Sequence, residues 1–111
     1  MKKIALPVAN GILCPHFGHS EQFHVFDVEG TKITNETILP PPPHEPGILP
    51  RWLSEKNVTD VIAGGMGQRA ITLFNQQRIN VYVGAPSKKP KELVEDFLNG
   101  TLETSINLCD H

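Results

Sequence analysis

The sequence places one thiol and two imidazoles within a short segment. Cys14, His16 and His19 lie in the run Cys14-Pro15-His16-Phe17-Gly18-His19. Thiolates and neutral imidazoles are ligands for transition metals, but the paired C-x-x-C motifs of structural zinc sites are absent from the sequence. We predict that these three side chains form part of a transition-metal or metal-sulfur cluster site. An inert buried Cys beside ordinary loop histidines is the simpler alternative.

Further residues of the same ligand types occur far away in the sequence. Cys109 and His111 lie at the C-terminal end, and His44 lies in a proline-rich segment. A tail that carries Cys109 and His111 could close over a bound cluster, and His44 could approach the same edge of the protein. A solvated tail and an exposed loop histidine are the competing interpretations.

The glycine-rich run Gly64-Gly65-Met66-Gly67 is the second chemical feature. It follows an apolar run and precedes a helical pattern, so its backbone can approach a ligand and the helix N-terminus can offer N–H groups to sulfide or an oxyanion. Gly65, Gly67 and Ala70 also satisfy the G-x-G-x-x-G/A spacing, but no carboxylate follows at the end of the next strand to bind a ribose. We therefore favour a cluster site over a dinucleotide site, with Met66 as a ligand contact or as core filler.

Size, composition and charge exclude several classes of protein. A chain of 111 residues and 12.3 kDa fits one domain. The net charge of -2 provides no basic field for nucleic acid. No apolar stretch approaches the ~20 residues needed to cross a bilayer, and the N-terminus does not resemble a signal peptide. We expect a cytoplasmic protein in which Cys14 and Cys109 form no structural disulfide.

Common catalytic motifs are missing from the sequence. There is no G-x-S-x-G elbow, no H-E-x-x-H helix, no P-loop and no carboxylate on the first strand to bind the magnesium ion of a nuclease. A thiol enzyme with Cys14 as nucleophile and His16 or His19 as base stays open. We predict that the protein is not an enzyme.

The spacing of apolar residues predicts the elements that position these side chains. Strands are expected at residues 3–9, 23–29, 32–39, 58–63 and 79–83, and helices at residues 47–56, 68–78 and from a Ser87 cap to Gly100. Residues 10–20 are expected to form a loop, and residues 40–50 a stiff crossover.

The order β-β-β-α-β-α-β-α predicts an α/β fold with a five-stranded mixed sheet and helices on both faces. Ligands of such sheets bind beyond the carboxyl ends of parallel strands, where the Cys14 loop and the glycine-rich run are expected to meet. Residues 1–100 are expected to form a single domain, and residues 101–111 a flexible C-terminal tail.

Four motifs in order resemble the dinitrogenase iron-molybdenum cofactor biosynthesis family. They are Pro15-His16-Phe17-Gly18-His19 followed by Phe23, His44-Glu45-Pro46-Gly47 before Trp52-Leu53, Gly64-Gly65-Met66-Gly67-Gln68-Arg69-Ala70, and Ile79-Asn80-Val81. The resemblance spans about residues 4 to 100. It implies a ribonuclease H-like fold without nuclease activity and a protein that binds or carries an iron-sulfur or molybdenum-containing cofactor or its precursor.

Residue types and the resemblance together give the expected site residues. The cofactor would contact Gly64, Gly65, Met66, Gly67, Phe17 and Gly18, and the metal ligands would come from Cys14, His16, His19, Cys109, His111 and His44. The chain is similar to the orange protein of sulfate-reducing bacteria, which binds a molybdenum-copper sulfide cluster, so copper is also an option. The short tail departs from the longer His-rich or Cys-rich tails of other members, which puts ligation by the tail in doubt.

Proteins that donate and accept the cluster are the implied partners. One subunit offers few thiolates, so a homodimer that supplies ligands from two chains is compatible with the sequence. The alternative function is a regulatory or scaffolding module that binds another protein and whose Cys and His residues are incidental.

Overall fold

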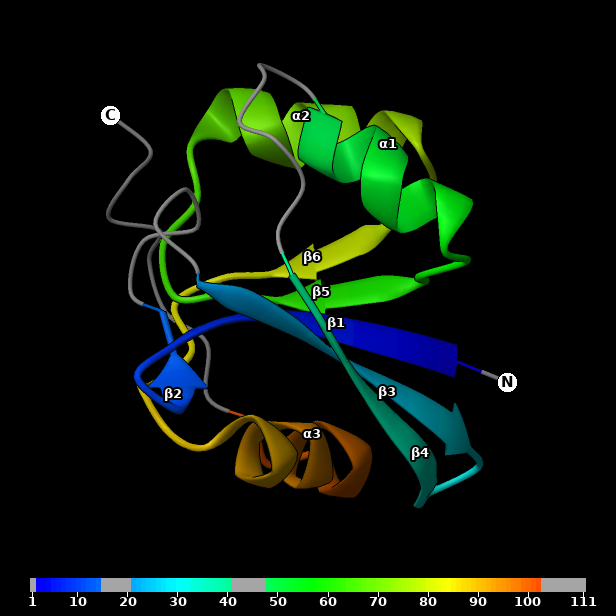
Figure 1. Ribbon diagram of the computed structural model, residues 1–111, viewed down its shortest axis with the longest axis vertical. Helices are drawn as coiled ribbons and strands as arrows, with labels where there is room; N and C mark the ends of the chain where they lie inside the picture. Colours follow the sequence, from blue (N-terminus) through cyan, green and yellow to red (C-terminus); the bar gives the residue numbers. More distant parts are fainter. Residues whose placement is uncertain (1, 15–20, 41–47, 103–111) are drawn as a thin grey trace.

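Figure 1 shows the computed structural model, in which residues 2–14, 21–40 and 48–102 are described. The elements are β1 (Lys2–Ala9), β2 (Ile12–Leu13), β3 (Gln22–Glu29), β4 (Lys32–Leu39), α1 (Ile48–Glu55), β5 (Asp60–Ile62), α2 (Gln68–Gln76), β6 (Asn80–Tyr82) and α3 (Pro90–Asn99). The predicted mixed α/β architecture is confirmed. None of the helices within the described ranges is long and apolar enough to cross a membrane.

The strands form one mixed sheet in the order β4-β3-β1-β5-β6, with β2 paired to β1 beside this path. The first half of the chain contributes antiparallel pairs, β1 with β3 and β3 with β4. The second half contributes parallel pairs, β1 with β5 and β5 with β6. The carboxyl ends of β1, β5 and β6 therefore lie at the same edge of the sheet.

The predicted count of five strands is wrong, because β2 raises the number to six. Residues 10–20 were expected to be a loop, but Val8 pairs with Leu13 and Ala9 with Ile12. Asn10 and Gly11 make the turn between them with φ values of 56° and 80°. Two adjacent residues with positive φ form the tight hairpin turn that an Asn-Gly dipeptide favours. That dipeptide is the sequence signal for β2.

Helices cover both faces of the sheet, as predicted (Figure 1). The first core cluster lies under α1 and α2, and the second under α3. The first cluster contains Ala5, Phe23, Val25, Leu53, Val58, Val61, Ala63, Met66, Phe74 and Ile79. The second contains Ile4, Leu6, Val8, Leu13, Phe26, Val28, Ile62, Ala85, Leu93 and Val94. Neighbouring residues of β1 and β5 enter opposite clusters because successive strand side chains point to opposite faces.

The ends of α1 and α2 lie within two residues of their predicted positions, but the start of α3 was assigned to the wrong cap residue. Gly100 ends α3 in the left-handed conformation with φ of 74°, as a C-terminal glycine should. The predicted Ser87 cap is wrong, since α3 begins at Pro90 and Lys89 occupies the cap position without a side-chain hydrogen bond. Proline restricts the residue before it to extended conformations, and Lys89 has φ of -62° and ψ of 141°.

The predicted boundary between the domain and the tail lies just after α3. The Thr101 N–H donates to the Asp96 carbonyl at 2.8 Å, and Leu102 packs against the second core cluster. Residues 103–111 lie outside the described ranges. The division of the chain into a domain and a flexible tail stays a prediction.

The packing of α3 makes a prediction about stability. Leu93 is fully buried in the second core cluster, so Leu93→Ala should lower the free energy of unfolding by about 2–5 kcal/mol, because it removes methyl groups and leaves a cavity. Urea denaturation followed by circular dichroism measures this loss. The neighbouring exposed residue provides the control, since Glu92→Ala should change stability by less than about 0.5 kcal/mol. Equal losses for the two variants would contradict the described packing of α3.

Candidate functional site

Three loops are joined at the edge where the parallel strands end. The Gly84 N–H donates to the Gly64 carbonyl at 2.6 Å, and the Ala85 N–H donates to the Ala63 carbonyl at 3.2 Å. These bonds continue the contact of β5 with β6 beyond the last strand residues. The Leu13 N–H donates to the Lys88 carbonyl at 2.9 Å, which connects β2 to the same β6–α3 loop. The glycine-rich run and the Cys14 segment are thereby linked through residues 84–88.

The carboxyl end of β1 also fixes the segment that begins with Cys14. The Cys14 N–H donates to the Pro7 carbonyl, and the Glu21 N–H donates to the Val8 carbonyl, both at 2.9 Å. The two described residues that flank positions 15–20 are thus bonded to adjacent residues of β1. In Figure 1, the ends of β1, β5 and β6 and the strand β2 lie on the same side of the molecule.

The two described sulfur-bearing candidates, Cys14 and Met66, are buried. Cys14 is 3% exposed, and Met66 is 1% exposed and belongs to the first core cluster. Gly65 is buried, Gly64 is half-buried and Gly67 is exposed. The two middle residues of the run are thus buried, and its last residue, Gly67, reaches the surface. Met66 fixes it to the core, and Gly67 brings its backbone to solvent.

Gly67 occupies the N-cap of α2 and borders open space. Its φ of -67° and ψ of 151° suit any residue, and a Cβ atom built on it would meet nothing within 4 Å. No side chain caps the helix, and no acidic residue lies in its first turn. The first N–H groups of a helix have no intrahelical partner and favour negative charge. The glycine leaves these groups accessible to an anion.

Seven predicted site residues lie outside the described ranges. They are His16, Phe17, Gly18, His19, His44, Cys109 and His111. Their roles stay predictions. Within residues 2–14, 21–40 and 48–102, no group of three His, Cys, Asp or Glu side chains is placed to bind a metal ion. The described part of the site therefore consists of the Cys14 thiol, the glycine-rich run and the N-terminus of α2.

The contact between His24 of β3 and Glu36 of β4 was not predicted from the sequence. His24 Nδ1 lies 3.0 Å from a carboxylate oxygen of Glu36, and its Nε2 atom is buried without a hydrogen-bond partner in the described structure. The pair forms because His24 is opposite Ile38 and Phe26 is opposite Glu36, across β3 and β4. The register of the β3–β4 pair shifts between Asp27 and Val28. If residues are paired by counting from the turn without this shift, every residue beyond it is assigned the wrong partner.

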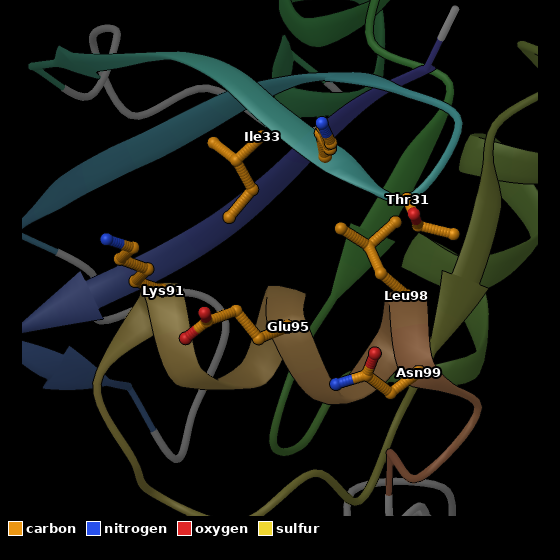
Figure 2. A pocket seen from close by; sticks show the side chains of 7 residues that line it. Thr31, Ile33, Lys91, Glu95, Leu98 and Asn99 are labelled. Atoms are coloured by element: carbon orange, nitrogen blue, oxygen red, sulfur yellow. The ribbon is translucent and has the colours of Figure 1, made fainter.

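A groove of about 360 Å³ lies away from these loops, between the β3–β4 turn and α3. Figure 2 shows Ile33 and Leu98 directed toward each other across it. Its lining residues are Thr31, Lys32, Ile33, Lys91, Glu95, Leu98 and Asn99. None of them belongs to the predicted site.

Asp60 is the one charged residue in the described core and serves to connect strands. Its side chain is 1% exposed and accepts hydrogen bonds from Thr59 Oγ1 at 2.7 Å and from Asn80 Nδ2 at 3.1 Å. Burial raises the pKa of the Tyr82 hydroxyl, and the charge of Asp60 and a hydrogen bond with it raise this pKa further. Asp60 lies at the start of β5, at the end of the sheet opposite the joined loops.

Known proteins share this sequence pattern and fold. Residues 1–100 match the family described as dinitrogenase iron-molybdenum cofactor. An uncharacterized protein of Methanocaldococcus jannaschii is 33% identical over 108 residues, covering 93% of this chain and 91% of that protein. The crystal structure of PH0822 has a TM-score of 0.87 and 28% identity, and 95% of this chain and 96% of that chain are covered. The apo form of the orange protein from Desulfovibrio gigas shares the fold, with a TM-score of 0.76, 21% identity and coverage of 96% and 95%.

The burial of Cys14 predicts slow alkylation. In a Cys109→Ser background, where Cys14 is the remaining thiol, iodoacetamide should label the folded protein at least about tenfold more slowly than the protein in urea, because the thiol reacts only after local opening. Mass spectrometry over time measures both rates. Equal rates in the two conditions would show that Cys14 is accessible, as a catalytic thiol would be.

Tyr82 is the single tyrosine of the chain, so its ionisation can be followed by ultraviolet absorbance. Asp60→Asn should move the pKa of Tyr82 down toward the ordinary value of 10.0, because it removes the negative charge nearby. In the unchanged protein, stability should fall as the pH rises above 10.0, since the unfolded chain releases the tyrosine proton first. An unchanged tyrosine pKa in Asp60→Asn would contradict the described contact.

Proposed function

The chain belongs to the dinitrogenase iron-molybdenum cofactor family, and we propose that it binds and carries an iron-sulfur or molybdenum-containing cofactor, or a precursor, without turnover. Copper is a further option for the metal. The cluster is the cargo of this protein, received from a donor protein and passed to an acceptor protein in the cytoplasm. A homodimer could supply ligands from two chains.

The observation that carries this proposal is the joining of three loops at the carboxyl edge of the sheet. Backbone hydrogen bonds connect Gly64 to Gly84 and Leu13 to Lys88. A thiol, a glycine-rich run and a helix N-terminus lie on these connected segments. A metal-sulfur cluster needs a soft ligand for the metal and N–H donors for its sulfides, and these segments provide both kinds of group.

The described residues take different roles in this proposal. Cys14 is the thiolate ligand, and its burial requires that the cluster enters between the loops or that the Cys14 segment opens. Gly64, Gly65 and Gly67 let the cluster approach the backbone. Met66 anchors the run in the core, and its thioether is the second sulfur that a cluster could contact.

The residues outside the described ranges complete the proposed site. His16 and His19 follow Cys14 closely in the sequence and are proposed as ligands, with Phe17 and Gly18 as contacts. His44, Cys109 and His111 are proposed as additional ligands. These roles rest on residue type, and those of His16, Phe17, Gly18, His19 and His44 rest also on the family resemblance.

The burial of Cys14 also favours the second candidate function. A Cys that is 3% exposed is as expected for a core residue of a protein-binding module as for a ligand. The two functions differ in what the thiol does. A carrier loses its cargo when Cys14 is replaced, whereas a scaffold keeps its partner.

Anaerobic reconstitution tests the carrier function. Incubation with iron, molybdate or copper together with sulfide should give a coloured protein with bound metal and sulfide, and Cys14→Ser should lose most of the metal, because an alcohol is a poor ligand for these metals. Metal analysis and visible spectroscopy after gel filtration provide the readout. A colourless, metal-free product with every metal would refute the proposal.

The open space at Gly67 allows a second variant with a matched control. Gly67→Leu keeps an accessible backbone conformation and fills the space before the α2 N-terminus, so it should reduce bound metal without unfolding the protein. Gln76→Leu adds a similar side chain to the exposed other end of α2 and should bind metal normally. Equal metal contents in the two variants would exclude Gly67 from the site.

A further inference from the structure

The sheet has one long edge that no described segment covers. β4 stands at the end of the strand order and, among the described strands, pairs with β3 alone. Six of its eight residues are exposed. The other edge strand, β6, has only three residues. β4 therefore presents the longer row of backbone N–H and C=O groups that an additional strand could pair with.

One half of β4 lacks the bulge and the proline that often protect an edge strand. The register shift between Asp27 and Val28 lies in the half next to the hairpin turn, and such bulges discourage pairing with other chains. Residues 35–39 pair regularly with β3 and contain no proline. This regular half ends beside Phe23, at the same end of the sheet as the Cys14 segment.

The side chains on this half have a defined chemistry. Ile38 is 53% exposed, and only one other large apolar residue of the described structure, Ile12 at 38%, is classed as exposed. The Glu36 side chain is 43% exposed, and one of its oxygens is held by His24, so the other can accept a hydrogen bond from outside. Glu36 and Ile38 lie on one face because they are two residues apart in a strand.

The groove beside α3 lies outside this regular half. It adjoins the start of β4, and Figure 2 shows Ile33 and Leu98 among the side chains that line it. The surface of residues 35–39 is therefore defined by β4 itself.

We propose that residues 35–39 of β4 bind an extended segment of another protein, with a basic side chain opposite Glu36 and a β-branched apolar side chain beside Ile38. The added strand pairs with the backbone of β4, and the cross-strand contacts select its sequence. The surface shares no residue with the candidate metal site. The inference therefore does not depend on a bound cluster.

A second copy of this chain fits the surface less well. Antiparallel pairing of residues 35–39 with themselves places Glu36 opposite Ile38 when Thr37 is on the two-fold axis, and opposite another Glu36 when Glu36 is on the axis. Neither register supplies a cation to the carboxylate, and the second brings like charges together. A basic strand from another protein removes this conflict.

The test uses the eight-residue peptide Thr-Thr-Thr-Val-Thr-Lys-Thr-Thr with blocked ends, and the same peptide with Glu in place of Lys. Val and Lys are two residues apart in it, so they share one face and can lie opposite Ile38 and Glu36 in an antiparallel pair. Titration of the isotope-labelled protein, followed by amide NMR shifts, should show binding of the Lys peptide at residues 35–39. Glu36→Gln and Ile38→Ala should each weaken it about twofold to fivefold, because each substitution removes one cross-strand contact.

Matched controls make the result decisive. Ile12→Ala changes the other exposed isoleucine of the described structure and should leave peptide affinity unchanged. N-methylation of alternate peptide amides should abolish binding, because it removes the strand donors. Equal affinity for the Lys and Glu peptides, shifts centred on β6, or self-association of the protein that Ile38→Glu abolishes would each overturn the proposal.

Discussion

The missing donor of Pro7 determines how the centre of the sheet is arranged. The N–H and C=O of a strand residue point to the same side, and the Pro7 carbonyl accepts from Cys14. The position where another residue would offer its N–H therefore faces the side of β1 that is paired with β2 and β5. The described β1–β5 register covers Ile4 and Ala5 only, and β2 pairs with β1 beyond it. A proline inside a central strand is tolerated because the neighbouring strand changes there.

This change of neighbour creates the candidate site. Because β5 leaves β1 early, its chain turns through the glycine-rich run while β2 fills the vacated position and places Cys14 beside Pro7. The same strand fixes Glu21 on its other side through Val8. A single buried strand thus holds both ends of the segment that contains the predicted ligands His16 and His19. The helix dipole of α2 adds a preference for negative charge nearby.

The sequence predicted the parts of the fold that depend on local patterns. The Gly30 turn and the apolar residues Ile33 and Ile38 located β4 at residues 32–39, and the glycine at position 100 located the end of α3. It missed β2 because two residues are too few for a periodic pattern, although Asn10-Gly11 is a hairpin signal. Ser87 was preferred as a cap on residue type, whereas Pro90 and the bond from Leu13 to Lys88 keep the preceding segment extended. The His24–Glu36 pair depends on a bulge, which sequence spacing does not reveal.

Main-chain hydrogen bonds join the described loops at the carboxyl edge. Their hydrogen bonds run from Gly84 to Gly64, from Leu13 to Lys88 and from Cys14 to Pro7. Amide groups do not titrate in the physiological range and are not oxidised when a thiol is. The frame of this edge should therefore keep its shape when Cys14 is oxidised to a reversible form such as a sulfenic acid, so that oxidation of the thiol abolishes binding but leaves a protein that a reductant can restore.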